Sequence, residues 1–219
     1  MRPRSLMAIV VVFLSAGACF GAPVETTSAS PLGNVDGGKN ETAIGDLVAD
    51  SIRETLQTQI AFVASSELRL KDPPIPAGKV SSAQIAALAS YPNDPLAILS
   101  IQGKAIKQAL EKSVAICPQR NQGFLQVSGL RFTFDPSKPV GSRATSVTIG
   151  SAQLSDNDYY SVGVTSSMAN GALGYWKVWT KDDVRRRLPD QNVVRAVESY
   201  FKGHPTINYG VLDRVSVGR

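Results

Sequence analysis

The stretch that decides the fold is residues 124–143, which reads FLQVSGLRFTFDPSKPVGSR. Aromatic and other apolar side chains recur over 124–134 and favour β-structure, and the Ser128-Gly129 pair among them predicts a bulge or a bend. Residues 135–139 end this strand, because proline donates no hydrogen bond to a ladder and aspartate initiates turns. Alternation resumes over 143–149 and predicts a second strand. The stretch therefore predicts a β-hairpin.

Helical and strand patterns alternate on both sides of this hairpin. Thr42 is expected to cap the first helix, whose apolar residues recur at helical spacing on one face. Helices are predicted over 42–56, 81–89, 103–114, 181–188 and 189–201, and strands over 60–63, 96–101, 159–165 and 214–217. This order predicts the α+β class, with a mixed sheet, a central antiparallel hairpin and flanking helices.

The N-terminus has the composition of an export signal. Residues 1–22 begin with two arginines, continue with an apolar run over 6–14 and end in small residues. This pattern predicts a signal peptide and an exported protein, periplasmic or extracellular, with no transmembrane segment after processing. Cleavage after Ala18 and cleavage after Ala22 both fit the pattern. Cys19 leaves open a third outcome, in which a lipid anchors the protein to a membrane.

Composition limits the class of protein and of partner. The 219 residues are 43% hydrophobic and 19% charged, which is typical of one globular domain. The net charge of +5 falls by two when the leader with its arginines is removed, so the sequence does not favour nucleic acid as a partner. Residues 23–39 are rich in Ser, Thr, Gly and Pro and predict a flexible linker, and residues 40–219 the folded domain. Cleavage beyond Cys19 would leave Cys117 as the one cysteine, without a disulfide.

Several phrases resemble those of a known family. FLQVSGL and DPSKP in the hairpin, ETAIGDLVAD at 41–50 and the helix at 103–114 are similar to the C-terminal, substrate-recognition domain of the 5'-nucleotidase / UDP-sugar hydrolase family. In complete enzymes of that family, a two-metal phosphoesterase domain precedes this one. This sequence has one histidine, His204, and no DxH, GNHD or HExxH motif. It therefore predicts the C-terminal domain without the metallophosphatase domain, with no catalytic residue, metal ligand or cofactor.

The resemblance also implies a nucleotide pocket, built in the family from three phrases. NGGGIR falls on residues 64–69, where the sequence keeps only the arginine, as Arg69. The phrase PFGN places Pro92 where the family has a stacking phenylalanine, and it ends at Asp94. Tyr91 lies next to that proline and can stack in its place. Arg69 and Asp94 are therefore predicted substrate-binding residues.

The third phrase, NFxANGGDGF, falls on residues 166–175. Ser167 replaces the second stacking aromatic, and Leu173 replaces the aspartate that binds the ribose. Asn170 and Tyr175 are the remaining predicted substrate-binding residues. Loss of both aromatics removes on the order of 1 to 3 kcal/mol of stacking for each ring. The pocket is therefore expected to be degenerate.

Two functions from different classes follow from these observations. The first is an exported, non-catalytic domain that acts as a binding or partner module. Its partners would be a separately encoded metallophosphatase protein and, weakly, a nucleotide or another small anion. The alternative is a nucleotide or nucleotide-sugar phosphohydrolase, which acts alone or together with such a metallophosphatase subunit. The missing metal-site motifs favour the first function.

Overall fold

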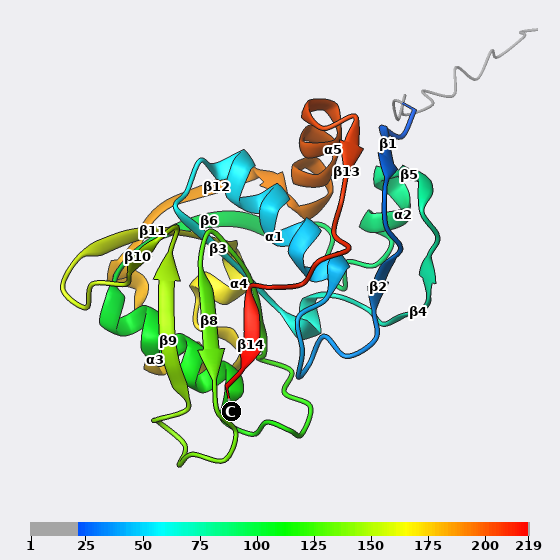
Figure 1. Ribbon diagram of the computed structural model, residues 1–219. Coiled ribbons are helices and arrows are strands. Elements are labelled where there is room, and N and C mark those ends of the chain that lie inside the picture. The colour runs from blue at the N-terminus through cyan, green and yellow to red at the C-terminus, as the bar shows by residue number, and fades with distance from the viewer. Residues whose placement is uncertain (1–21, 219) are drawn as a thin grey trace, which may run out of the picture.

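A computed structural model of the chain describes residues 22–218, and its architecture is α+β (Figure 1). The predicted signal peptide, apart from its last residue, lies outside the described residues, and so does Cys19. Among residues 22–218, no helix is both long and apolar enough to cross a membrane.

The main sheet has five strands in the order β12-β6-β11-β3-β7. Their bounds are β3 Ile60–Ala64, β6 Pro95–Gln102, β7 Leu125–Ser128, β11 Tyr159–Thr165 and β12 Val184–Asn192. The sheet is mixed, because β11 runs parallel to β3 while the other neighbours are antiparallel. The strands predicted at 60–63, 96–101 and 159–165 are thereby confirmed.

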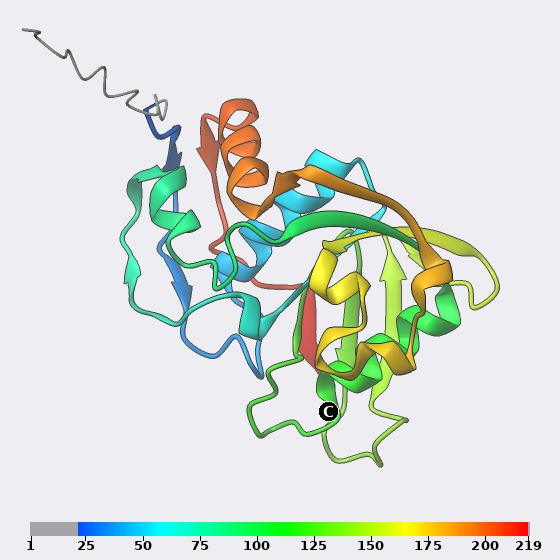
Figure 2. The same cartoon turned by 180° about the vertical axis from the view of Figure 1, so that it is seen from behind.

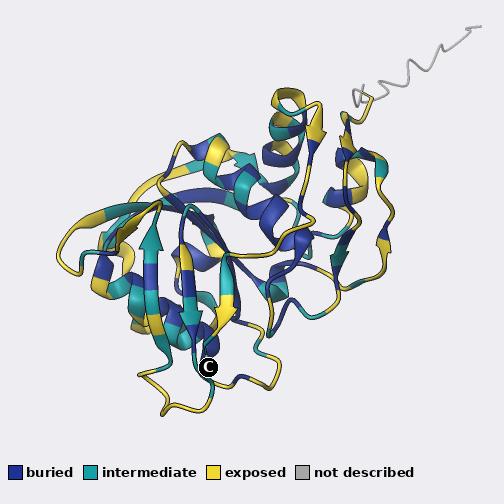
Figure 3. Ribbon diagram, in the orientation of Figure 1, coloured by how far each residue is buried: buried dark blue, intermediate teal, exposed yellow. Residues whose placement is uncertain are grey.

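Each face of this sheet builds its own hydrophobic core. Alternate side chains of β3 point to opposite faces, so that Ile60 and Phe62 belong to one core and Ala61 and Val63 to the other. The second core lies under α1 (Ala43–Leu56) and α5 (Val193–Gly203). The first core packs against α3 (Gly103–Val114), which lies with α4 (Ser166–Ala169) on the side that Figure 2 shows. Strands covered on both faces are buried almost throughout (Figure 3).

The predicted hairpin is confirmed as β8 (Arg131–Phe134) and β9 (Ala144–Ile149), but it lies in a second sheet and not in the main one. This sheet has the order β10-β9-β8-β14, with β10 at Ala152–Gln153 and β14 at Val215–Val217. The bend expected before it occurs at Gly129, which has a positive φ of 81°. A β-carbon there would collide with the carbonyl oxygen of Gln59, so this position requires glycine.

The prediction of a flexible linker over 23–39 is wrong. This segment contains β1 (Glu25–Ser28) and β2 (Leu32–Asn34). Strand β1 pairs with β5 (Gly78–Ser81) and with β13 (Thr206–Ile207), and β2 pairs with β4 (Lys71–Ile75). Polar side chains such as Thr26 and Ser28 take the inward positions of β1, so no apolar alternation marks this strand in the sequence.

The C-terminal third differs most from the prediction between residues 181 and 201. Residues 184–192, expected to lie in helices, form the edge strand β12 beside β6. The helix α5 begins at Val193 instead of at Pro189, and Asn192 caps it by accepting a hydrogen bond from the Arg195 N–H at 3.0 Å. At the other end of the chain, the Thr42 cap of α1 is confirmed by its hydrogen bond from Gly45 N–H. The remaining helical elements are α2 Ser82–Ala86 and the 3-10 turns Ser65–Glu67, Ala172–Lys177 and Lys181–Asp183.

Candidate functional site

An open pocket of about 570 Å³ lies where the segment after β3 approaches the loop before β7. Its lining residues are Gly38, Ser65, Ser66, Tyr91, Arg120, Asn121 and Gln122. Two of the family phrases reach it, NGGGIR through the two serines and PFGN through the tyrosine. We call it the Tyr91 pocket.

Two side chains give the Tyr91 pocket its chemistry. Tyr91 is 64% exposed, so its ring offers a free face to a flat ligand. The side chain of Arg120 is 52% exposed, and its Nη1 lies 3.2 Å from the Val35 carbonyl oxygen and 3.8 Å from the carboxylate of Asp36. A guanidinium in this position can pair with an anionic group of a ligand. Motif reasoning pointed to Tyr91 but not to Arg120, which belongs to no family phrase.

The far wall of the Tyr91 pocket is a loop fixed by Asn121. Its side-chain amide donates to the carbonyl oxygens of Lys112 and Ser113, at 3.1 and 2.7 Å, and its side-chain oxygen accepts from Gly123 N–H at 2.9 Å. The Ser65 hydroxyl donates to the Asn121 carbonyl oxygen at 2.7 Å. These bonds hold the loop against the end of α3, so the wall is formed before any ligand binds.

A buried carboxyl group, Glu67, joins the segments behind the pocket. It accepts hydrogen bonds from the Ala64 N–H at 2.7 Å and from the Thr165 hydroxyl at the end of β11. Burial, with a contribution from the charge of Asp94, raises the pKa of Glu67 to about 7, although the two hydrogen bonds oppose the shift. Its carbonyl oxygen accepts from the Ser90 N–H at 2.8 Å, which fixes the residue before Tyr91. Glu67 occupies a glycine position of the phrase NGGGIR. In the sequence, a single acidic residue directly after an apolar strand is the feature that could have indicated this buried carboxyl group.

The four predicted substrate-binding residues do not lie around the Tyr91 pocket. Asp94 accepts from the Ser167 N–H at 3.1 Å, which joins the second phrase to the third. The side chain of Asn170 accepts from Arg187 at 2.7 Å. Arg69 is exposed, and its backbone is held by Leu88 and Asn34.

Tyr175, the fourth predicted residue, lies inside the protein. It is 0% exposed, stacks on Trp179 with ring centroids 4.8 Å apart and donates its hydroxyl proton to the Gly123 carbonyl oxygen at 2.6 Å. Its place is therefore in the core, where it supports the loop that walls the pocket. The assignment of Arg69, Asp94, Asn170 and Tyr175 to substrate stays a prediction.

Other reactive groups lie apart from the Tyr91 pocket lining. Cys117 is 3% exposed, and burial raises the pKa of its thiol against the opposing charge of Arg143, as expected for a structural cysteine. His204 ends α5 and lies 3.5 Å from the Glu54 carboxylate. Among the residues that the structure describes, no three His, Cys, Asp or Glu side chains are grouped so as to hold a metal ion.

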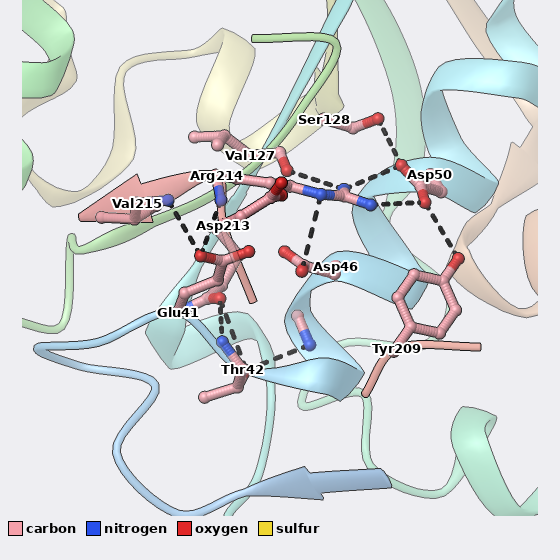
Figure 4. A network of polar contacts seen from close by, with 12 residues as sticks. Glu41, Thr42, Asp46, Asp50, Val127, Ser128, Tyr209, Asp213, Arg214 and Val215 are labelled. Atoms are coloured by element: carbon pink, nitrogen blue, oxygen red, sulfur yellow. Dashed lines mark hydrogen bonds and ion pairs between the residues drawn. The ribbon is translucent and has the colours of Figure 1, made fainter. Parts of the chain in front are cut away.

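A second cluster of polar side chains, which we call the Arg214 network, lies at the other end of β7 (Figure 4). Arg214 donates from both terminal nitrogens to the two carboxylate oxygens of Asp50, each at 2.8 Å. Asp50 also accepts from the hydroxyls of Ser128 and Tyr209. Burial alone would raise the pKa of Asp50, but Arg214 and these hydroxyls lower it. The network therefore joins α1, β7 and the C-terminal segment.

One carboxyl group of the Arg214 network carries a proton at neutral pH. Burial raises the pKa of Asp46 to about 9, with the neighbouring Glu41 adding to the shift and Arg214, at 3.5 Å, opposing it. Glu41 accepts from the N–H groups of Arg214 and Val215 through one oxygen. Its other oxygen and Oδ1 of Asp46 have no other partner among the described residues, so the Asp46 proton can join them. In the sequence, an acidic residue on the apolar face of α1 is the feature that could have indicated this buried carboxyl group.

Comparison with known proteins decides the family. The sequence matches the family described as "5'-nucleotidase, C-terminal domain" over residues 23–181. The chain belongs to this family. The resemblance in the hairpin and in α1 is thereby confirmed, and the family match covers the whole lining of the Tyr91 pocket but ends before Arg214.

Relatives of this 5'-nucleotidase C-terminal domain are longer proteins. An apyrase from Aedes albopictus is 26% identical over 148 residues, which cover 62% of this chain and 26% of the apyrase. A snake venom 5'-nucleotidase from Macrovipera lebetinus is 35% identical over 86 residues, 36% of this chain and 21% of that protein. The crystal structure of a 5'-nucleotidase precursor from Thermus thermophilus superposes with a TM-score of 0.76 and 26% identity, over 89% of this chain and 39% of that one. The α+β fold is confirmed, and the match spans about a quarter or less of the length of the curated relatives.

Proposed function

We propose that this 5'-nucleotidase C-terminal domain is a non-catalytic binding module that takes a nucleotide-type ligand weakly in the Tyr91 pocket. The observation that carries the proposal is the pairing of an exposed tyrosine ring with the Arg120 guanidinium in one preformed pocket of about 570 Å³. A flat base can stack on the ring while the guanidinium meets a phosphate group. Two relatives bear the names apyrase and 5'-nucleotidase, which supports a nucleotide as the ligand class.

The side chains present limit the affinity. Stacking on one ring contributes on the order of 1 to 3 kcal/mol, and an exposed ion pair about 0 to 1 kcal/mol. Together these terms reach at most about 4 kcal/mol, so the dissociation constant is about a millimolar at the tightest. The Ser65 hydroxyl adds little, because it already donates to the loop. The domain therefore binds nucleotides far more weakly than a complete enzyme site needs.

The absence of catalysis is proposed from the sequence, which has one histidine and no two-metal motif. Since relatives carry this domain as part of a longer chain, a metallophosphatase protein is the proposed partner. Export to the periplasm or the cell exterior is proposed from the leader-type residues 1–22.

The proposal is tested by titrating the mature chain with AMP, adenosine and UDP-glucose, with calorimetry or tyrosine fluorescence as the measure of binding. We expect a dissociation constant for AMP of about a millimolar or weaker, and binding weakened roughly 5- to 150-fold in Tyr91→Ala, the factor that corresponds to a loss of 1 to 3 kcal/mol. The matched control is Tyr159→Ala, which removes another tyrosine of similar exposure, 59% against 64%. Micromolar binding of AMP, or equal binding by the two variants, would contradict the proposal.

A further inference from the structure

A second pocket, of about 360 Å³, lies beside the Arg214 network and is distinct from the Tyr91 pocket. Strand β7 separates the two, because Gln122 precedes it at the first pocket and Ser128 ends it at the second. Three guanidinium groups line the second pocket, those of Arg53, Arg131 and Arg214. We call it the Arg53 pocket.

The three arginines differ in whether a carboxylate group already pairs with their guanidinium. Arg214 is paired with Asp50 through both terminal nitrogens. Arg131 lies 3.2 Å from the Asp213 carboxylate in an exposed pair, which water and salt screen. Arg53 donates only its Nε proton, to the Ser128 hydroxyl at 2.7 Å. Its two terminal nitrogens have no hydrogen bond or ion pair with any other described residue, so its charge is left without a counter-ion.

The backbone is shaped to keep Arg53 in this place. Gly129 has a positive φ of 81°, and a β-carbon on it would lie 3.0 Å from Cδ of Arg53. Ser128, which orients the Nε of Arg53, is in turn held by Asp50. The guanidinium is therefore fixed along one edge while its outer edge faces the pocket. A planar fork of this kind binds phosphate and carboxylate groups through two parallel hydrogen bonds.

We propose that the Arg53 pocket binds a small oxyanion, a phosphate or carboxylate group, between the terminal nitrogens of Arg53 and the side chain of Arg131. Arg214 is paired with Asp50 and Arg131 with Asp213, whereas the terminal nitrogens of Arg53 have no carboxylate of the described residues within ion-pair distance and would pair with the ligand. Asp50 does not compete for Arg53, because Arg214 and two hydroxyls already occupy its oxygens. The glycines at 129 and 150 leave room for the ligand at the pocket wall.

The test is an NMR titration of the mature chain with inorganic phosphate and, separately, with acetate, against sodium chloride of equal ionic strength. We expect saturable shifts of the Gly129 and Gly150 amides and of the Arg53 Nε–H with at least one of the two anions. A response to phosphate alone or to acetate alone identifies which group the pocket takes. Absence of saturable shifts at these positions with both anions would overturn the proposal.

Variants connect this response to the guanidinium. Arg53→Gln should weaken anion binding at least tenfold, and the matched control Arg195→Gln, on the exposed side of α5, should bind as the wild type does. Arg131→Gln changes an exposed side chain and should weaken binding several-fold, which keeps the test informative if Arg53→Gln fails to fold. Tyr91→Ala should leave this response unchanged, which separates it from the nucleotide pocket. Unchanged binding in both Arg53→Gln and Arg131→Gln would contradict the assignment.

Discussion

The two ends of β7 use polar side chains in opposite ways. Before its first residue, the Tyr91 pocket presents exposed side chains, and the arginine there has partners only at 3.2 and 3.8 Å. After its last residue, Glu41 and Asp46 of the Arg214 network are buried, and the guanidinium of Arg214, 19% exposed, is paired through both terminal nitrogens. The first arrangement leaves Tyr91 and Arg120 available to a ligand, whereas the second uses Arg214 and Asp50 to hold the fold and leaves only the neighbouring guanidinium of Arg53 to the proposed anion.

The largest expected effect comes from breaking the Arg214 network. Arg214→Ala leaves Asp50, whose side chain is only 15% exposed, without its partner, which costs up to about 3 to 5 kcal/mol in the free energy of unfolding. Arg120→Ala, the corresponding change at the exposed end, should cost less than about 1 kcal/mol. Urea denaturation of both variants measures the two costs. Equal losses would show that the contrast between the two ends is mistaken.

A second test uses Glu67, the buried group behind the Tyr91 pocket. Its pKa of about 7 in the folded protein exceeds its ordinary value of 4.5, so the folded state keeps the proton that the unfolded state releases. The contribution of protonated Glu67 to the free energy of unfolding is therefore fully present below about pH 4.5 and is lost as the pH rises to about 7. Glu67→Gln keeps a neutral side chain throughout, so its stability relative to the wild type should rise on the order of 2 kcal/mol between pH 5 and pH 8. Denaturation at both pH values measures the difference, and a constant one would show that Glu67 is ionised in the folded protein.

A third test sharpens the assignment of the shared proton in the Arg214 network. The pKa of Asp46 is raised to about 9, so between its ordinary value and that value the folded state holds a proton that the unfolded state lacks. Stability should fall with pH in this window, by up to about 1.4 kcal/mol per pH unit. Above about pH 7.5, Glu67 has already titrated, so the slope that remains up to pH 9 belongs mainly to Asp46.

Asp46→Asn tests this assignment, because it removes the titratable group. Its amide can still donate a hydrogen bond to Glu41, as the protonated acid does. We expect the variant to fold, and its unfolding free energy to change less between pH 7.5 and pH 9 than that of the wild type. Thermal denaturation across this window measures both proteins. An equal slope in the two would place the proton elsewhere.

The sequence predicted the elements whose apolar pattern is local. The hairpin at β8 and β9, the helix α1 and the strand β3 were expected at their places, because each carries its own period. Strand β1 was not expected, since its inward side chains Thr26 and Ser28 are polar. The sequence predicts helix at the residues of β12, because its arginines are exposed at the edge of a sheet and a charged run resembles a solvated helix face.

The candidate sites were predicted less completely than the fold. Tyr91 can be identified from the sequence because it lies in the phrase PFGN next to Pro92, but Arg120 approaches it only in the folded chain. The partners Asp50 and Arg214 are 164 residues apart, and no local pattern indicates that they meet. Arg69 and Tyr175 are predicted from the family phrases, but neither lines the Tyr91 pocket. An amino acid that is kept in a motif need not keep its place in the structure when the residues around it have changed.

The central claim, that the domain binds a nucleotide without hydrolysing it, is tested most directly by phosphorus NMR of AMP mixed with the mature chain and manganese or cobalt. Manganese and cobalt ions are paramagnetic and broaden the phosphorus signal, so binding is measured first, in a sample without metal. The ion is then added, the sample is incubated, and hydrolysis is measured after the ion has been removed with a chelator. We predict a saturable change of the AMP resonance with a dissociation constant of about a millimolar or weaker, a weaker response in Tyr91→Ala, and no inorganic phosphate after prolonged incubation. Release of phosphate that follows the protein through purification, and that a chelator present from the start prevents, would contradict the account.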